Sequence, residues 1–95
     1  MNRKDAHVEK VEAQIRELTA QVEELRTRAD KAEAPAKLDY KKGLQELHDK
    51  KEALEQKLRD LKVAGEGAWE DLKAGVDSAW NELKKTSDKI FSRFK

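Results

Sequence analysis

The feature that most constrains the fold is a run of apolar residues spaced alternately three and four positions apart from residue 8 to residue 32. A period of about 3.5 residues is typical of a left-handed coiled coil. β-branched residues at three heptad a positions, with leucine at two d positions, favour a two-stranded parallel pairing. This first seam comprises Val8, Val11, Ile15, Leu18, Val22, Leu25, Ala29 and Ala32.

Composition supports helices and argues against sheets. Charged residues make up 43% of the 95 residues and aromatic residues 5%, with one Pro and four Gly. Strands would require more β-branched and aromatic residues between turn-forming residues. We therefore expect an all-α chain of one domain at most, and the composition argues against a β-sandwich and an α/β enzyme.

A second seam follows in the middle of the chain, one residue out of phase with the first. It comprises Tyr40, Leu44, Leu47, Lys51, Leu54, Leu58 and Leu61. Pro35 lies where the phase changes, and a proline marks either a kink or the first turn of a new helix. We expect a kink, with a full reversal of the chain as the alternative.

The last third carries an eleven-residue repeat in which Trp69, Trp80 and Phe91 occupy equivalent positions. Eleven residues in three turns fit a nearly straight or slightly right-handed helix. Gly65 and Gly67 precede the repeat and weaken a helix by about 1 kcal/mol each. Because the repeat keeps its phase across them, we expect a flexible Gly hinge at 65–67, with a turn as the alternative.

These patterns divide the chain into three parts of one structural unit. Residues 1–34 and 35–64 are predicted to form coiled-coil helices, and residues 65–95 to form an amphipathic helix rich in tryptophan. Long helices kinked near Pro35 are the expected arrangement, and a three-helix bundle is the alternative.

The predicted C-terminal helix has an apolar face that needs a surface to lie on, because burial of that face must offset the entropy of ordering the helix. The face comprises Trp69, Leu72, Val76, Trp80, Leu83, Ile90, Phe91 and Phe94. The surface could belong to the chain's own coiled coil, another subunit, a client protein or a membrane. The basic end of this helix is typical of membrane-surface helices, but the acids in 66–83 would be repelled by anionic lipid. We favour packing within the chain or between subunits.

Sites of chemistry are scarce in the sequence. His7 and His48 are the only histidines, they lie on separate segments, and neither has a partner at metal-ligand spacing. The chain has no Cys, and its net charge of +1 gives no field for nucleic acid. We expect no enzymatic activity, cofactor, metal, nucleic acid or small-molecule substrate. Because no secretory signal or membrane-spanning run is evident, a cytoplasmic location is expected.

The stretch AWEDLKAGVDSAWNELKKTSDKIFSRFK, preceded by AKLDYKKGLQELHDKKEALEQKLRDLK, resembles a family of small bacterial coiled-coil stress-response proteins first identified in cyanobacteria. The resemblance covers about residues 30–95, and A-W-E-D-L-K-x-G-V-x-x-A-W-x-E-L-K at 68–84 is its most distinctive part. It implies a cytoplasmic, non-enzymatic helical protein associated with stress, and it supplies no site residues. Pro35 departs from the uninterrupted helix that the family implies.

Two functions are compatible with these patterns. The first is a self-associating coiled coil that acts as a structural or interaction module, with homo-oligomers or a client protein as partners. The second is a peripheral lipid-binding or protective amphipathic helix.

Overall fold

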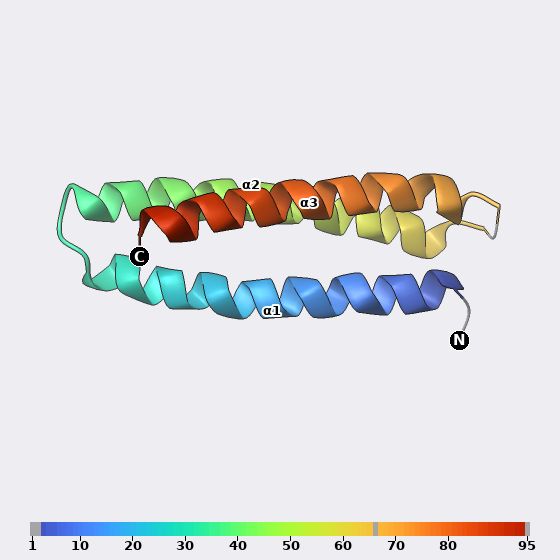
Figure 1. The fold of residues 1–95 in the computed structure, drawn as a ribbon, viewed down its shortest axis with the longest axis horizontal. Helices are drawn as coiled ribbons and strands as arrows, with labels where there is room; N and C mark the ends of the chain where they lie inside the picture. The colour runs from blue at the N-terminus through green and yellow to red at the C-terminus, as the bar shows by residue number, and fades with distance from the viewer. Residues whose placement is uncertain (1–2, 66, 95) are drawn as a thin grey trace.

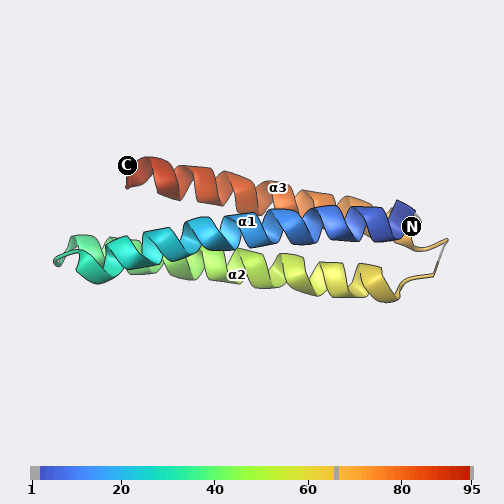
Figure 2. The same cartoon turned by 90° about the horizontal axis from the view of Figure 1, so that it is seen from below.

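A computed structural model describes residues 3–65 and 67–94, and it shows three long helices side by side (Figure 1). The helices are α1 (Arg3–Lys31), α2 (Ala36–Val63) and α3 (Trp69–Arg93). They form a bundle that measures 51 × 19 × 18 Å. α1 and α3 run in the same direction and α2 runs opposite to both (Figures 1 and 2). The prediction of an all-α chain is confirmed, and the three-helix bundle is the arrangement adopted.

The expected kink near Pro35 is wrong, because the chain reverses there. α1 ends at Lys31, and Pro35 occupies the N-cap position of α2. The first turn of α2 is closed by hydrogen bonds from the Lys37 N–H to the Glu33 carbonyl and from the Leu38 N–H to the Pro35 carbonyl, both 3.0 Å. Proline lacks an N–H, and a helix start is the place where no N–H is needed. The phase change between the two seams marks two helices that face each other.

The second connection is also a reversal, where the sequence predicted a flexible Gly hinge at 65–67 and left a turn open. α2 ends at Val63 and Ala64 is extended, with φ −72° and ψ 143°. The Trp69 N–H then donates to the Gly65 carbonyl at 3.2 Å as α3 begins. Residue 66, inside the predicted hinge, lies outside the described residues. The phase that the repeat keeps across the glycines does not reflect one shared environment, because Leu47 and Leu58 of α2 are buried in the core whereas Trp69 of α3 lies at its edge.

The core is built from the two predicted seams and a lane of α3. Its buried members are Val8, Val11, Leu18, Leu25, Leu47, Leu54, Leu58, Leu61, Val76, Leu83 and Ile90. Four further seam residues, Ile15, Val22, Tyr40 and Leu44, pack against this cluster. Ala29 is also buried, and the seam residues Ala32 and Lys51 are half-buried. Each predicted seam leucine or valine therefore lies in or against the core. α3 contributes its buried residues at steps of seven, as expected for helices that cross at a small angle.

Close approach and polar contacts fix how the helices lie together. A Cβ built on Gly43 of α2 would come within 3.1 Å of Ile90 Cγ2, so α3 packs tightly against α2 at this point. Lys62 of α2 pairs with Glu12 of α1 at 3.2 Å. The Lys4 ammonium donates to the Lys62 and Ala64 carbonyls, both at 3.0 Å, and so caps the C-terminal end of α2.

Candidate functional site

The candidate site is a groove between α1 and α3. α2 packs closely against both other helices, whereas α1 and α3 pack less closely against each other. Three clefts of about 560, 230 and 530 Å³ follow one another along this boundary. We call their combined surface the α1–α3 groove. Its α1 side is formed mainly by Arg3, Lys10, Gln14, Glu17, Gln21 and Glu24, and its α3 side by Trp69, Lys73, Trp80, Lys84, Asp88 and Phe91.

One aromatic residue of the eleven-residue repeat lies in each cleft. Trp69 lines the first cleft, Trp80 the second and Phe91 the third. Eleven residues at 100° each turn the helix by about 20° beyond three full turns, so the three rings follow one line along α3. All three are half-buried and pack against the edge of the core. The eleven-residue repeat therefore marks the groove, while the seven-residue step of α3 marks the core.

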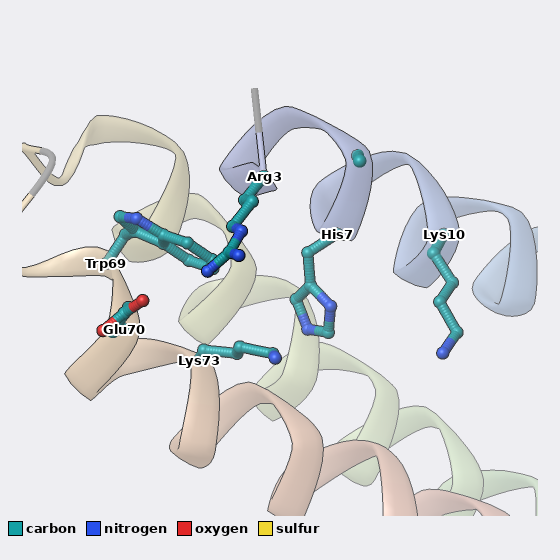
Figure 3. Close-up of a pocket in the computed structure, with 7 residues that line it drawn as sticks. Arg3, His7, Lys10, Trp69, Glu70 and Lys73 are labelled. Atoms are coloured by element: carbon teal, nitrogen blue, oxygen red, sulfur yellow. The ribbon is translucent and has the colours of Figure 1, made fainter. Parts of the chain in front are cut away.

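The first cleft is basic. Figure 3 shows Arg3 and His7 of α1 and Lys73 of α3 projecting toward the space between the two helices. Lys10 and Glu70 complete the charged lining, which leaves a positive excess. His7 Nε2 lies 2.8 Å from Asp77 Oδ1, a contact that joins α1 to α3. The imidazole is largely covered, whereas the carboxylate is 46% exposed.

The opposite end of the groove is acidic. Glu17 and Asp88 line the second cleft beside Lys84. Glu24, with Arg28, lines the third cleft, which Asp88 also reaches. The polarity of the groove comes from α1, whose lining residues are basic near its start and acidic further along. α3 contributes one charge of each sign at either end, Glu70 with Lys73 and Lys84 with Asp88. A surface with this polarity binds best to one that carries the reverse order of charge.

The predicted interaction face of α3 is divided among the core, the groove and, for Leu72 and Phe94, positions that belong to neither. Val76 and Leu83 are 0% exposed, and Ile90 is buried with them, so the chain's own α1 and α2 cover these three. Leu72 is 38% exposed. Phe94 stacks on Tyr40, with ring centroids 4.0 Å apart and planes inclined by 20°. The residues left at the surface are Leu72, Trp69, Trp80, Phe91 and Phe94.

Several structural contacts have no clear signal in the sequence. His7 and Asp77 are seventy positions apart, and Lys4 caps a helix that ends some sixty positions later. Ser87 is buried against the core, although its neighbours are polar. The only hint was that His7 occupies a g position, which flanks the first seam.

His48, the second histidine of the sequence, lies apart from the groove. His48 pairs with Glu52 at 3.3 Å on an exposed face, one turn away along the same helix. Within residues 3–65 and 67–94, no group of three or more His, Cys, Asp and Glu side chains could hold a metal ion. Among those residues, no helix is both long and apolar enough to cross a membrane. The absence of enzymatic activity stays a prediction.

Comparisons with known proteins give no relative. No family model matches the chain, and no curated protein or solved structure matches it. The resemblance to bacterial coiled-coil stress-response proteins therefore stays a prediction.

Proposed function

We propose that this protein is a non-enzymatic helical module that self-associates through the α1–α3 groove. The observation that carries the proposal is the line of Trp69, Trp80 and Phe91 along three consecutive clefts. Half-buried aromatic rings in clefts are the usual anchors of protein interfaces. Helices that pack along the groove would cover the rings and extend the bundle by the same packing that holds α1, α2 and α3 together.

A second copy of the chain is the partner that the charges favour. The groove contains both signs, arranged from a basic to an acidic end, and the whole chain has a net charge of +1. An anionic membrane would attract one end of the groove and repel the other. A two-fold interface, in contrast, requires a surface that complements itself when reversed, and the groove has that property.

The setting that we propose is structural support or interaction during stress in the cytoplasm, without nucleic acid or a small-molecule substrate. The motif at 68–84 supports the link to stress, because it resembles the family described above. Trp69 and Trp80 belong both to that motif and to the groove.

The proposal is tested by placing a charge in the middle of the groove. Trp80→Arg should abolish self-association, whereas Leu38→Arg, which changes an exposed apolar residue on α2 outside the groove, should leave it intact. Light scattering during size-exclusion chromatography gives the mass, and circular dichroism shows whether the variants stay helical. Equal masses for the wild type and a helical Trp80→Arg variant would contradict a contact at the groove.

A parallel measurement separates self-association from lipid binding. We expect helicity and tryptophan fluorescence to stay unchanged when vesicles of anionic phospholipid are added, because the helices already bury their core within the chain. A large gain in helicity with vesicles would favour the peripheral lipid-binding function instead.

A further inference from the structure

The charges of the groove specify how two copies would pair, an inference that rests on the proposed self-association. On α1, the basic residues Arg3 and Lys10 precede the acidic residues Glu17 and Glu24 at steps of seven. A two-fold axis that crosses α1 beside Gln14 exchanges Arg3 with Glu24 and Lys10 with Glu17. A second copy laid antiparallel over the first therefore places opposite charges together along the whole of α1.

The same operation matches the side chains of α3. An axis beside Trp80 exchanges Lys73 with Asp88, which carry opposite charges and line the groove. It also exchanges Lys84 with Asp77, whose half-exposed carboxylate contacts His7 beside the first cleft. It further brings Trp80 next to Trp80 of the second copy and Trp69 next to Phe91. The register of these aromatic pairs differs from that of the charge pairs by one residue. Rings that are half-exposed in one copy would then be covered by rings of the other.

The two axes coincide in the structure. Gln14 of α1 and Trp80 of α3 line the same central cleft, so they lie at the same height along the bundle. α1 and α3 run in the same direction, so one rotation reverses both helices together (Figure 1). A single two-fold axis through the central cleft thus satisfies both sets of pairs.

A parallel pairing fits less well. With the two copies face to face and their helices in the same direction, α1 of one copy would lie over α3 of the other at equal height. Lys10 would then face Lys73, because both line the first cleft. Glu24 would face Asp88, because both line the third. Glu17 would face Lys84 and Arg3 would face Glu70, so a parallel pairing joins like charges as well as opposite ones. Like charges that face each other weaken an interface. In the antiparallel pairing, no two groove residues of like charge named above face each other.

We propose that two copies of this chain pair antiparallel, groove to groove, about a two-fold axis beside Gln14 and Trp80. Arg3 and Lys10 of each copy lie against Glu24 and Glu17 of the other, and the three aromatic residues of α3 form the apolar centre of the contact. The partner of the groove is thus the same groove of a second copy, running in the opposite direction.

Charge reversal tests this pairing. The basic-end variant carries Arg3→Glu and Lys10→Glu, and the acidic-end variant carries Glu17→Lys and Glu24→Lys. All four side chains are exposed, and within the described residues none contributes to the ion pairs between helices. Each variant alone should self-associate at least about tenfold more weakly, because every α1 pair becomes repulsive. An equal mixture of the two should associate as tightly as the wild type.

A matched control removes the effect of net charge. Lys41→Glu with Lys42→Glu makes the same change in charge as the basic-end variant, but at exposed residues of α2 outside the groove. This control should self-associate like the wild type, and it should not rescue the acidic-end variant. Rescue of the acidic-end variant by the control would mean that overall charge, and not paired grooves, drives the association.

Cysteine cross-linking gives the direction independently, because the chain contains no Cys. Gln14→Cys lies beside the axis and should form a disulfide with itself across two copies. Ala6→Cys should couple to Gln21→Cys in a mixture, and only weakly to itself. Coupling of Ala6→Cys to Lys73→Cys in a mixture, as readily as to Gln21→Cys, would place α1 over α3, because Ala6 and Lys73 line the same cleft. That result, with wild-type association of the charge variants, would overturn the antiparallel pairing and leave the proposed self-association standing. A wild-type chain that stays single at every concentration would overturn both.

Discussion

Two sets of apolar residues on the same helix, α3, lie in different environments; we call the set that recurs every seven residues the core lane and the set that recurs every eleven residues the groove lane. Val76, Leu83 and Ile90 recur every seven residues and are fully covered by α1 and α2. Trp69, Trp80 and Phe91 recur every eleven residues and lie half-buried along the α1–α3 groove. The larger side chains are therefore at the edge of the bundle, and the smaller ones are at its centre.

In α3, the spacing of an apolar set indicates where it lies more clearly than the size of its residues does. Helices packed at a small angle keep a seven-residue lane in register along their length. An eleven-residue lane stays straight on its own helix, so it suits a surface that receives a further partner. Each lane can be tested on its own, because the residues that define the two lanes do not overlap.

The largest effect is expected in the core lane. Leu83→Ala removes a side chain that is fully buried, and it should lower the free energy of unfolding by about 2 to 5 kcal/mol. Denaturation by urea, followed by circular dichroism, measures this change. A loss below about 1 kcal/mol would contradict the assignment of this lane to the core.

The second largest loss of stability is expected when a larger side chain is placed between α2 and α3. Gly43→Leu adds a side chain where a built Cβ would already lie 3.1 Å from Ile90, so the helices must separate. We expect a loss of about 1 to 3 kcal/mol, which is typical of overpacking. Ala53→Leu, at an exposed position of the same helix, is the control and should change stability little. Equal unfolding midpoints for the two variants would show that the close approach is not maintained.

Substitution in the groove lane should separate stability from association. Trp80→Ala should cost only about 1 to 2 kcal/mol in unfolding at low protein concentration, because the ring is half-exposed. It should weaken self-association far more than Tyr40→Ala, whose ring stacks on Phe94 near the end of the bundle. Thermal melts and light scattering on both variants measure the two quantities. Similar small effects of both substitutions on association would argue against a tryptophan-lined contact.

The smallest effect is expected to be favourable. Gly75 lies within α3, and a Cβ built there has its nearest neighbour, Lys57 Nζ, at 3.9 Å. Gly75→Ala should therefore raise stability by about 0.5 to 1 kcal/mol, because alanine loses less backbone entropy in a helix. The urea midpoint should rise with unchanged slope. A fall would mean that α2 and α3 approach more closely here than the structure shows.

Much of the fold could be predicted from the sequence, because apolar spacing reports directly on helices. The apolar residues of the two seams, from Val8 to Leu25 and from Leu44 to Leu61, lie in or against the core. The reversal at Pro35 could not be predicted, since proline is equally compatible with a kink and with a first turn. Only the packing of α1 against α2 distinguishes the two.

The groove could be predicted only in part. The eleven-residue spacing of Trp69, Trp80 and Phe91 was visible, but their place beside α1 was not. That place depends on the direction of α3 relative to α1, which two reversals determine and which local patterns do not encode. The contact between His7 and Asp77 depends on the same geometry.

Sedimentation equilibrium of the wild-type chain over a wide range of concentrations is the most direct test of the central claim. We predict a mass that rises with concentration to twice the 10.9 kDa of one chain and then stays constant, because two reversed grooves cover each other completely. A constant mass of one chain, or a mass that keeps growing beyond two, would contradict the account.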